Sequence, residues 1–158
     1  MATSPTVRPL TLEAADLPAL SQFINGHHDK IICTANRAGE PNASLMGTPR
    51  LTVDGLIQFE ISDRASTTLD NLRQNPEILL MAYRPGARAR DYYGARVSAR
   101  VSALHTDGEV FESIRSAIAA QFGDVRAAEL RATVTCTITR VRAVVDRGQA
   151  WNDTSFDE

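Results

Sequence analysis

Runs of hydrophobic residues, either continuous or alternating with polar ones, mark most of this chain as β-strand. Residues 31–35 and 78–83 are almost entirely apolar, which is typical of buried strands. Between residues 91 and 104, apolar side chains alternate with polar or charged ones, which predicts a long strand with one inward and one outward face. Residues 133–145 predict another long strand that closes the domain.

Turn residues separate these strands. A Gly-Glu-Pro turn precedes a second strand, which is predicted over about residues 42–48. Asp54-Gly55 separates residues 51–53 from residues 56–61. This dipeptide easily takes the positive φ angles of a tight turn, so we predict a β-hairpin at this point.

Apolar residues recur at helical spacing in three short segments, each with a recognisable start or stop signal. The predicted helices are Asp16–Asn25, within an N-terminal helical region of residues 11–28, a helix from Ser66 or Thr67 to the stop at Asn75-Pro76, and residues 109–122.

Strands interrupted by short helices, without regular strand–helix alternation, favour a mainly β fold with helical decoration. Such a pattern indicates a β-barrel rather than a doubly wound sheet. No repeat or low-complexity linker divides the chain. We therefore expect a single domain over residues 1–158, with the barrel at residues 30–146 and a tail at residues 147–158.

Composition narrows the functional classes. The chain has 158 residues, of which 43% are hydrophobic and 23% charged, as in a globular domain. A formal net charge of -2 provides no overall positive field, so we expect no nucleic-acid partner. No apolar stretch approaches the roughly 20 residues of a membrane span, and residues 1–9 lack the apolar core of a secretion signal. We therefore expect a cytoplasmic protein without a membrane partner.

Isolated reactive side chains offer little chemistry. Cys33 and Cys136 stand singly in apolar runs, which favours buried thiols over a metal site or redox pair. The His27-His28 pair follows the first helix, where a solvated pair is favoured over a metal site. Lys30 is the only lysine, at a position expected to be on the surface. The sequence predicts no metal site and identifies no catalytic residue.

A series of motifs along the chain carries a family resemblance. In this order the motifs resemble the pyridoxamine 5′-phosphate oxidase-like family, and the resemblance covers about residues 30–145. It implies a split β-barrel of the Greek-key type that binds FMN. The motifs are Ser44-Leu45-Met46-Gly47-Thr48, the segment from Ser62 to Thr68, Asp70-Asn71-Leu72-Arg73-Gln74-Asn75-Pro76, Gly94 on a later strand, and Thr106-Asp107-Gly108 followed by Phe111-Glu112.

The resemblance also implies a set of cofactor-binding residues. Leu45, Met46, Gly47, Thr48, Ile61 and Ser62 would line the isoalloxazine ring, and Arg64, Ser66, Thr67 and Thr68 would surround the phosphate. Arg88 and Arg90 would reach the flavin of the other subunit in a homodimer. Apart from the resemblance, Trp151 follows the last predicted strand, where an aromatic residue can cover the flavin or the dimer seam.

Local physics supports the phosphate assignment, but each group also has a purely structural alternative. Hydroxyls and unpaired N–H groups at the start of a helix can hold a phosphate. The same residues can merely cap the helix, the arginines can form a solvated loop, and Trp151 can pack on its own barrel.

Two departures from the family affect the expected activity. Many relatives carry a lysine or arginine where this chain has Thr67-Thr68, so another residue must supply the charge for a phosphate. The Arg-x-His substrate motif of true pyridoxamine 5′-phosphate oxidases has no counterpart after Trp151, so we do not expect that activity.

The leading hypothesis is a homodimeric FMN-dependent oxidoreductase that acts on an unknown small molecule, with cofactor sites at the subunit interface. One alternative is a reductase that uses a deazaflavin coenzyme on the same fold. Another is a non-catalytic flavin-binding or heme-binding protein, or an electron carrier.

Overall fold

The computed structural model describes residues 16–154, except for the side chain of Arg64. Residues 11–15 of the predicted N-terminal helical region, and the last four residues of the predicted tail, lie outside the described residues. The strands are β1 (Lys30–Ala35), β2 (Pro41–Met46), β3 (Arg50–Leu51), β4 (Leu56–Ser62), β5 (Glu77–Arg84), β6 (Tyr93–His105) and β7 (Leu130–Ala143). The helices are α1 (Leu17–Asn25), α2 (Ser66–Gln74), α3 (Gly108–Phe122) and α4 (Asp124–Ala128), with short 3₁₀ turns η1 (Asp63–Ala65) and η2 (Ala89–Asp91).

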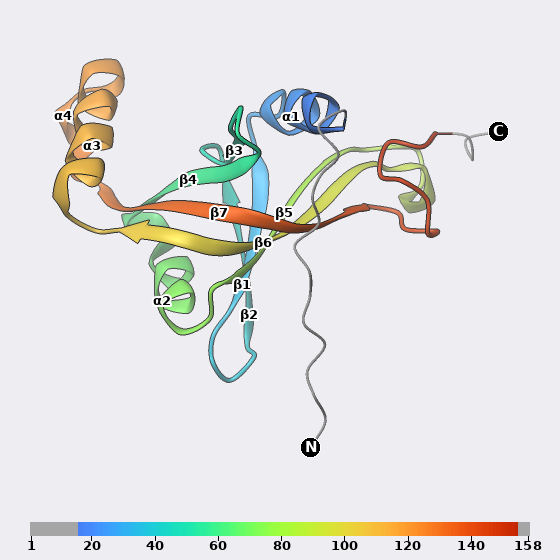
Figure 1. The fold of residues 1–158 in the computed structure, drawn as a ribbon, viewed down its shortest axis with the longest axis horizontal. Coiled ribbons are helices and arrows are strands. Elements are labelled where there is room, and N and C mark those ends of the chain that lie inside the picture. The colour runs from blue at the N-terminus through green and yellow to red at the C-terminus, as the bar shows by residue number, and fades with distance from the viewer. Residues whose placement is uncertain (1–15, 155–158) are drawn as a thin grey trace.

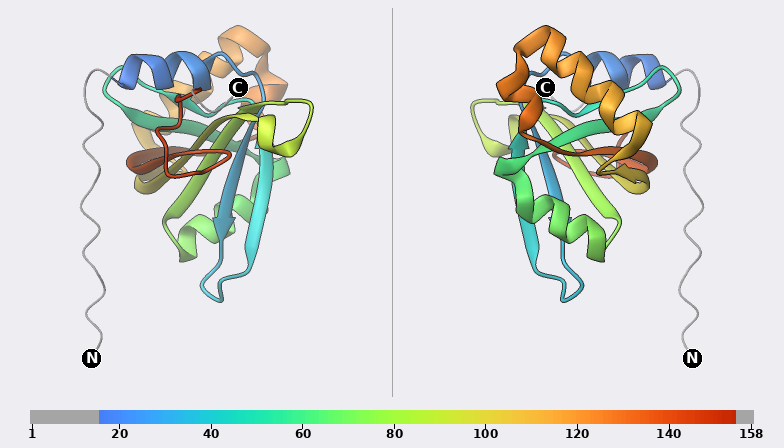
Figure 2. Two further views of the ribbon diagram at one scale, coloured as in Figure 1. Left: turned by 90° about the vertical axis from the view of Figure 1, so that its right-hand side faces the viewer. Right: turned by 90° about the vertical axis from the view of Figure 1, so that its left-hand side faces the viewer.

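Within the described residues, the strands form one antiparallel sheet in the order β2-β1-β5-β6-β7-β4-β3. The sheet curls into a half-barrel, with α1 above it and α2 below it in Figures 1 and 2. This is the mainly β split-barrel architecture, with helical decoration, that the sequence predicts. Because β2 stands at one end of this order, it pairs only with β1 among the described strands, and its other backbone edge has no described strand beside it.

The core fills the inner face of the curl. Every second residue of β4 is buried, as is every second residue in most of β5, and these side chains meet those of β6 and β7. Leu20 and Ile24 of α1 are fully buried against the sheet. The side-chain amide of Asn25 donates to the Leu51 carbonyl (3.0 Å) and its oxygen accepts the Leu51 N–H (2.9 Å), which fixes α1 on β3.

The predicted hairpin forms, with a different turn from the one expected. Gly55 has φ of 78°, whereas Asp54 does not take a positive φ. The Gly55 N–H donates to the Thr52 carbonyl (3.0 Å), and the Thr52 N–H donates to the Leu56 carbonyl (2.8 Å). The loop between Thr52 and Leu56 therefore holds three residues in place of two, and only its glycine takes the left-handed conformation.

Helix α4 is absent from the sequence prediction. Gly123, with φ of 93°, ends α3 and lets the chain turn into this single helical turn before β7. In Figure 1, α3 and α4 lie together beyond one end of β6 and β7. The pair therefore places a helical layer at one end of the sheet, on the connection between β6 and β7.

Lys30 is buried, so the expectation of a surface lysine is wrong. Only 4% of the residue is exposed, because it shares the inward-facing side of β1 with Ile32. Its ammonium donates to the His27 carbonyl at 2.6 Å, and burial lowers the pKa of this ammonium from its usual value. Cys136 is buried as predicted, whereas Cys33 is half-buried.

None of the helices between residues 16 and 154 combines the length and hydrophobicity that crossing a membrane demands.

Candidate functional site

A cavity of about 830 Å³ opens where β2 approaches the end of β4. The start of α2, the pair α3–α4 and the beginning of β7 complete its walls. Its size is within the range of small-molecule sites. The lining residues are Asn42, Ala43, Ser44, Leu45, Met46, Gly47, Thr48, Glu60, Ile61, Ser62, Ala65, Thr67, Ile118, Phe122, Arg126, Glu129 and Leu130.

The wall formed by β2 is held against β4 by Thr48. The Thr48 hydroxyl donates to the Glu60 carbonyl (3.1 Å) and accepts the Glu60 N–H (3.2 Å). At Gly47, a Cβ atom would lie 3.0 Å from the carbonyl oxygen of His28, closer than nearly all such contacts. A glycine here lets the chain leave β2 close to the preceding backbone and keeps this wall free of a side chain.

A buried polar group supports the same wall from behind. The hydroxyl oxygens of Ser44 and Thr68 lie 2.8 Å apart, and the Asn42 side-chain amide donates to Ser44 at 3.3 Å. Thr68 has no exposed surface. One turn later on α2, the Asn71 amide donates to the Thr34 hydroxyl at 3.1 Å. These bonds fix α2 to β1 and β2, and hold Ser44 at the cavity wall.

The charged groups of the cavity differ in their pairing. The Glu60 carboxylate accepts two hydrogen bonds from the Arg50 guanidinium, at 2.9 and 2.8 Å, and its charge is thereby balanced. Arg126 and Glu129 make no ion pair with another side chain that the structure describes. The cavity therefore presents one cation and one carboxylate that are available to a ligand.

Many of the residues predicted to bind a cofactor meet in this cavity, although they come from separate segments of the sequence. They are Leu45, Met46, Gly47, Thr48, Ile61, Ser62 and Thr67.

The other residues predicted to surround the phosphate do not all line the cavity. Ser66 is exposed outside the cavity lining, and Thr68 is buried behind the lining residue Ser44, with their hydroxyl oxygens 2.8 Å apart. The side chain of Arg64 lies outside the described residues. Of the three hydroxyl residues predicted to surround the phosphate, only Thr67 lines the cavity.

Arg88 and Arg90 are not among the residues that line this cavity, and they lie at the opposite end of β6 from its α3–α4 wall. Arg88 precedes η2 and Arg90 lies within it, before β6 begins, whereas α3 follows the other end of β6. A strand of that length spans about 40 Å at roughly 3.3 Å per residue. The Arg88 guanidinium binds the Asp91 carboxylate, with Nε to Oδ2 at 2.8 Å, and this pairing lowers the pKa of Asp91. Within one chain, these arginines do not contribute to the cavity.

Trp151 packs on its own barrel, next to a second cavity of about 480 Å³. Its ring lies 5.3 Å from the ring of Phe23 and 5.9 Å from that of Tyr93, centroid to centroid. The Arg84 guanidinium lies 4.6 Å from the centre of the Tyr93 ring. Trp151 thus packs against its own chain, as in the structural alternative given above, and it does not line the larger cavity.

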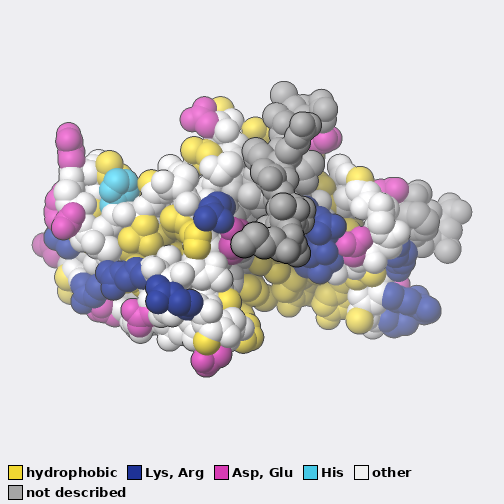
Figure 3. Space-filling view, turned by 60° about the horizontal axis from the view of Figure 1, so that its bottom comes forward, with side chains coloured by type: hydrophobic (Ala, Val, Ile, Leu, Met, Phe, Trp, Pro, Cys, Tyr) yellow, Lys and Arg dark blue, Asp and Glu magenta, His cyan; other side chains and the backbone are white. Residues whose placement is uncertain are grey.

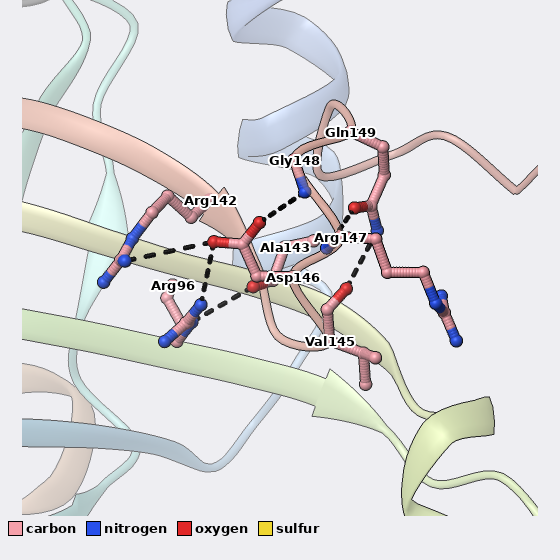
Figure 4. A network of polar contacts seen from close by, with 8 residues as sticks. All are labelled: Arg96, Arg142, Ala143, Val145, Asp146, Arg147, Gly148 and Gln149. Atoms are coloured by element: carbon pink, nitrogen blue, oxygen red, sulfur yellow. Dashed lines mark hydrogen bonds and ion pairs between the residues drawn. The ribbon is translucent and has the colours of Figure 1, made fainter.

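The chain that leads to Trp151 is held by the polar network in Figure 4. The Asp146 carboxylate accepts hydrogen bonds from the Arg96 guanidinium (3.2 Å) and the Gly148 N–H (2.9 Å). Arg96 also donates to the Ala143 carbonyl at 3.0 Å. These bonds turn the chain back after β7.

The sequence analysis missed the cavity wall that comes from α3 and α4. Ile118 belongs to the apolar stripe of the predicted third helix, whereas Phe122 is 64% exposed at the end of α3. Arg126 and Glu129 follow on α4 and the turn after it. In the sequence, the only local feature of this segment is Phe122 beside Gly123 at the end of the predicted helix.

Among the described residues, no cluster of His, Cys, Asp and Glu is suited to hold a metal ion. His28 is almost fully exposed, and its Nδ1 lies 3.3 Å from the Asp29 carboxylate.

The order of strands and helices in this chain has a counterpart in known proteins. Residues 17–145 match the sequence profile of a family described as pyridoxamine 5′-phosphate oxidase. The chain belongs to this family. The match includes every strand of the sheet and every helix around the cavity.

Solved structures with this fold share little sequence with the chain. An FMN-binding protein from Syntrophomonas wolfei superposes with a TM-score of 0.62 at 19% identity, covering 79% of this chain and 83% of its own. The heme storage protein HutZ from Vibrio cholerae gives 0.56 at 17%, covering 78% and 91%. A structure described as an F420 reductase gives 0.54 at 13%, covering 78% and 93%. Curated protein sequences gave no match.

Proposed function

We propose that this protein binds FMN in the cavity between β2 and β4 and is an FMN-dependent oxidoreductase that acts on a small molecule. The observation that carries this proposal is the meeting of the predicted flavin-binding residues Leu45–Thr48, Ile61, Ser62 and Thr67 in one cavity of about 830 Å³. The family match and the fold of an FMN-binding protein support the same choice of cofactor.

The cavity residues fit a flat ring with a polar edge. β2 is an edge strand, so part of its backbone N–H and C=O groups faces away from β1 and can hydrogen-bond a ligand. Gly47 keeps the wall thin, and Met46 and Ile61 supply apolar contact. When bound, the flavin supplies the hydride or electron transfer, while the protein binds, orients and shields it. The cytoplasmic location stays a prediction.

A homodimer is part of this proposal. On the outer face of the sheet, Ile31 lies between Leu45 and Met81, and Cys33 lies between Ala43 and Leu79 in the strand register. Leu45 is 70% exposed, and apolar surface of this kind is typical of protein interfaces. Figure 3 shows hydrophobic side chains gathered on one face of the molecule.

A second copy on this outer face would also lie beside the cavity, because Ala43 and Leu45 belong to both. The partner could then bring Arg88 and Arg90 close to the ligand, which a single chain cannot do. The position of the apolar face therefore supports the prediction of a cofactor site between two subunits.

The test is identification and titration of the bound cofactor. The purified protein is denatured, the released small molecules are identified by mass spectrometry, and the stripped protein is titrated with FMN while flavin fluorescence is followed. We expect FMN to bind, and the Ser62→Tyr variant, which fills the cavity, to weaken binding by at least about tenfold. Ser116→Tyr on α3 faces outside this cavity and is the matched control.

Recovery of a deazaflavin coenzyme in place of FMN would keep the cavity and replace the cofactor, in line with the fold of the F420 reductase. Recovery of heme would favour the non-catalytic alternative, in line with the fold of HutZ. Equal FMN affinity in the wild type and Ser62→Tyr would show that FMN does not use this cavity.

A further inference from the structure

We propose that Arg126 of α4 binds the phosphate group of the cofactor. This inference rests on the proposed function, because it takes the ligand of the cavity to be FMN. The residue lies outside every segment for which the sequence predicts a phosphate contact, and it enters the cavity from the α3–α4 pair.

The first argument is the charge in the cavity. Among the lining residues, Arg126 is the only one with a cationic side chain. A phosphate monoester carries between about 1.5 and 2 negative charges near neutral pH, and it is bound most strongly by charge-assisted hydrogen bonds. Thr67 lines the same cavity and can add a hydroxyl, but it carries no charge. An anionic group in this cavity therefore has one described cation to pair with.

The second argument is that Arg126 has no competing partner. Its guanidinium forms no ion pair with the described side chains, whereas the guanidinium groups of Arg50 and Arg131 are engaged by Glu60 and Asp63. An arginine that is left unpaired beside a cavity retains its hydrogen-bond donors for a ligand.

The third argument is the way in which the chain around α4 is fixed next to α2. The Asp63 N–H donates to the Glu129 carbonyl at 3.1 Å, and the Asp63 carboxylate pairs with Arg131. Asp63 begins η1, which leads directly into α2 and Thr67. Figures 1 and 2 show α2 and the α3–α4 pair at the same end of the sheet. Arg126 precedes Glu129 by less than one helical turn. It is therefore held at the end of the cavity where Thr67 lies, which is the end predicted to bind the phosphate.

Glu129 makes the sign of the electrostatic effect testable. Its carboxylate also lines the cavity and has no described ion-pair partner. It repels a bound phosphate, so removal of its charge strengthens phosphate binding, while removal of the charge of Arg126 weakens it.

The experiment compares FMN with riboflavin, which has the same ring and no phosphate. The full-length protein, stripped of cofactor, is titrated with each compound for the wild type, Arg126→Gln, Glu129→Gln and Arg115→Gln. Arg115 is the matched control, because it belongs to the same helical pair, pairs with Glu112 and lies outside this cavity. Thermal unfolding of each variant confirms that it is folded.

We expect Arg126→Gln to weaken FMN binding by about tenfold, the equivalent of about 1.4 kcal/mol, and to leave riboflavin binding within about twofold of the wild type. Glu129→Gln should strengthen FMN binding alone, and Arg115→Gln should change neither. A loss of affinity for FMN and riboflavin in equal measure, or no loss at all, overturns the role of Arg126 and leaves the proposed function standing. Failure of the wild type to bind either compound overturns both.

Discussion

The hydroxyl oxygens of Ser44 and Thr68 lie 2.8 Å apart and join the cavity wall on β2 to the fully buried face of α2. Thr68→Val keeps the shape of the side chain and removes this hydrogen bond. We expect a loss of about 1 kcal/mol of unfolding free energy, measured by denaturant titration, because Ser44 loses a partner at a half-buried site. FMN affinity should fall as well, since Ser44 becomes free to turn.

Thr67→Val is the matched control for this substitution, because Thr67 is the exposed neighbour on the same helix. Its unfolding free energy should stay within about 0.5 kcal/mol of the wild type. Equal stability of Thr68→Val and Thr67→Val would show that the buried hydrogen bond does not stabilise the fold.

Gly94 lies opposite Tyr83 in the register of β5 and β6, and a Cβ atom at this position would be 2.2 Å from the Ala82 carbonyl oxygen. Gly94→Ala therefore forces two backbones apart, and we expect a loss of about 3 kcal/mol in thermal or denaturant unfolding. Gly108→Ala provides the contrast: nothing lies within 4 Å of a Cβ atom there, and the only cost is the positive φ of 87°, about 1 kcal/mol. A smaller loss at Gly94 than at Gly108 would contradict the steric argument.

Leu45→Glu places a charge on the outer face proposed as the dimer interface. We expect the protein to become a monomer in light scattering, because the carboxylate loses its water when the second copy binds. Val53→Glu introduces the same charge at a residue that is 97% exposed in the β3–β4 turn, and it should leave the dimer intact. A Leu45→Glu protein that stays fully dimeric would exclude this face as the interface.

Cys136 makes stability depend on alkaline pH. Burial raises the pKa of its thiol from 9.0 to about 12, so between these values the unfolded chain loses a proton that the folded chain keeps. Folding stability therefore falls as the pH rises above 9.0. Near pH 10 this group alone contributes a loss of about 1.4 kcal/mol relative to neutral pH.

The measurement compares the unfolding free energy of the wild type and Cys136→Val at several pH values. The difference between the two should change with pH only above about pH 9. Cys33→Val provides the comparison with a half-buried thiol, whose pKa burial also raises. Parallel profiles for the wild type and Cys136→Val would contradict the burial argument.

Local patterns were sufficient where a segment's conformation depends on its own residues. The alternation in residues 91–104 predicted β6, and Asp54-Gly55 predicted the β3–β4 hairpin. The same dipeptide did not reveal the turn type, because that depends on which hydrogen bonds Thr52 makes. Helix α4 was missed because it is a single turn, and a helix this short is stabilised by its contacts rather than by its sequence.

The candidate site divides in the same way. The family resemblance carried by the order of motifs along the chain implied the β2 and β4 walls, and the structure brings those residues to one cavity. Arg126 and Glu129 could not be found, because α4 is placed beside the cavity by contacts between distant segments, such as the bond from the Asp63 N–H to the Glu129 carbonyl. Thr68 shows the reverse case, in which a predicted phosphate ligand pairs with Ser44 instead.

The sequence by itself determined the strands and most of the helices, since hydrophobic periodicity and turn residues act over a few neighbours, and the order of its motifs indicated the family. Only the tertiary structure decided that Lys30 is buried, that Trp151 packs on its own barrel and that an arginine of α4 lines the cavity. Those outcomes depend on which distant segments the curled sheet brings together. A local sequence pattern carries no information about contacts between distant segments.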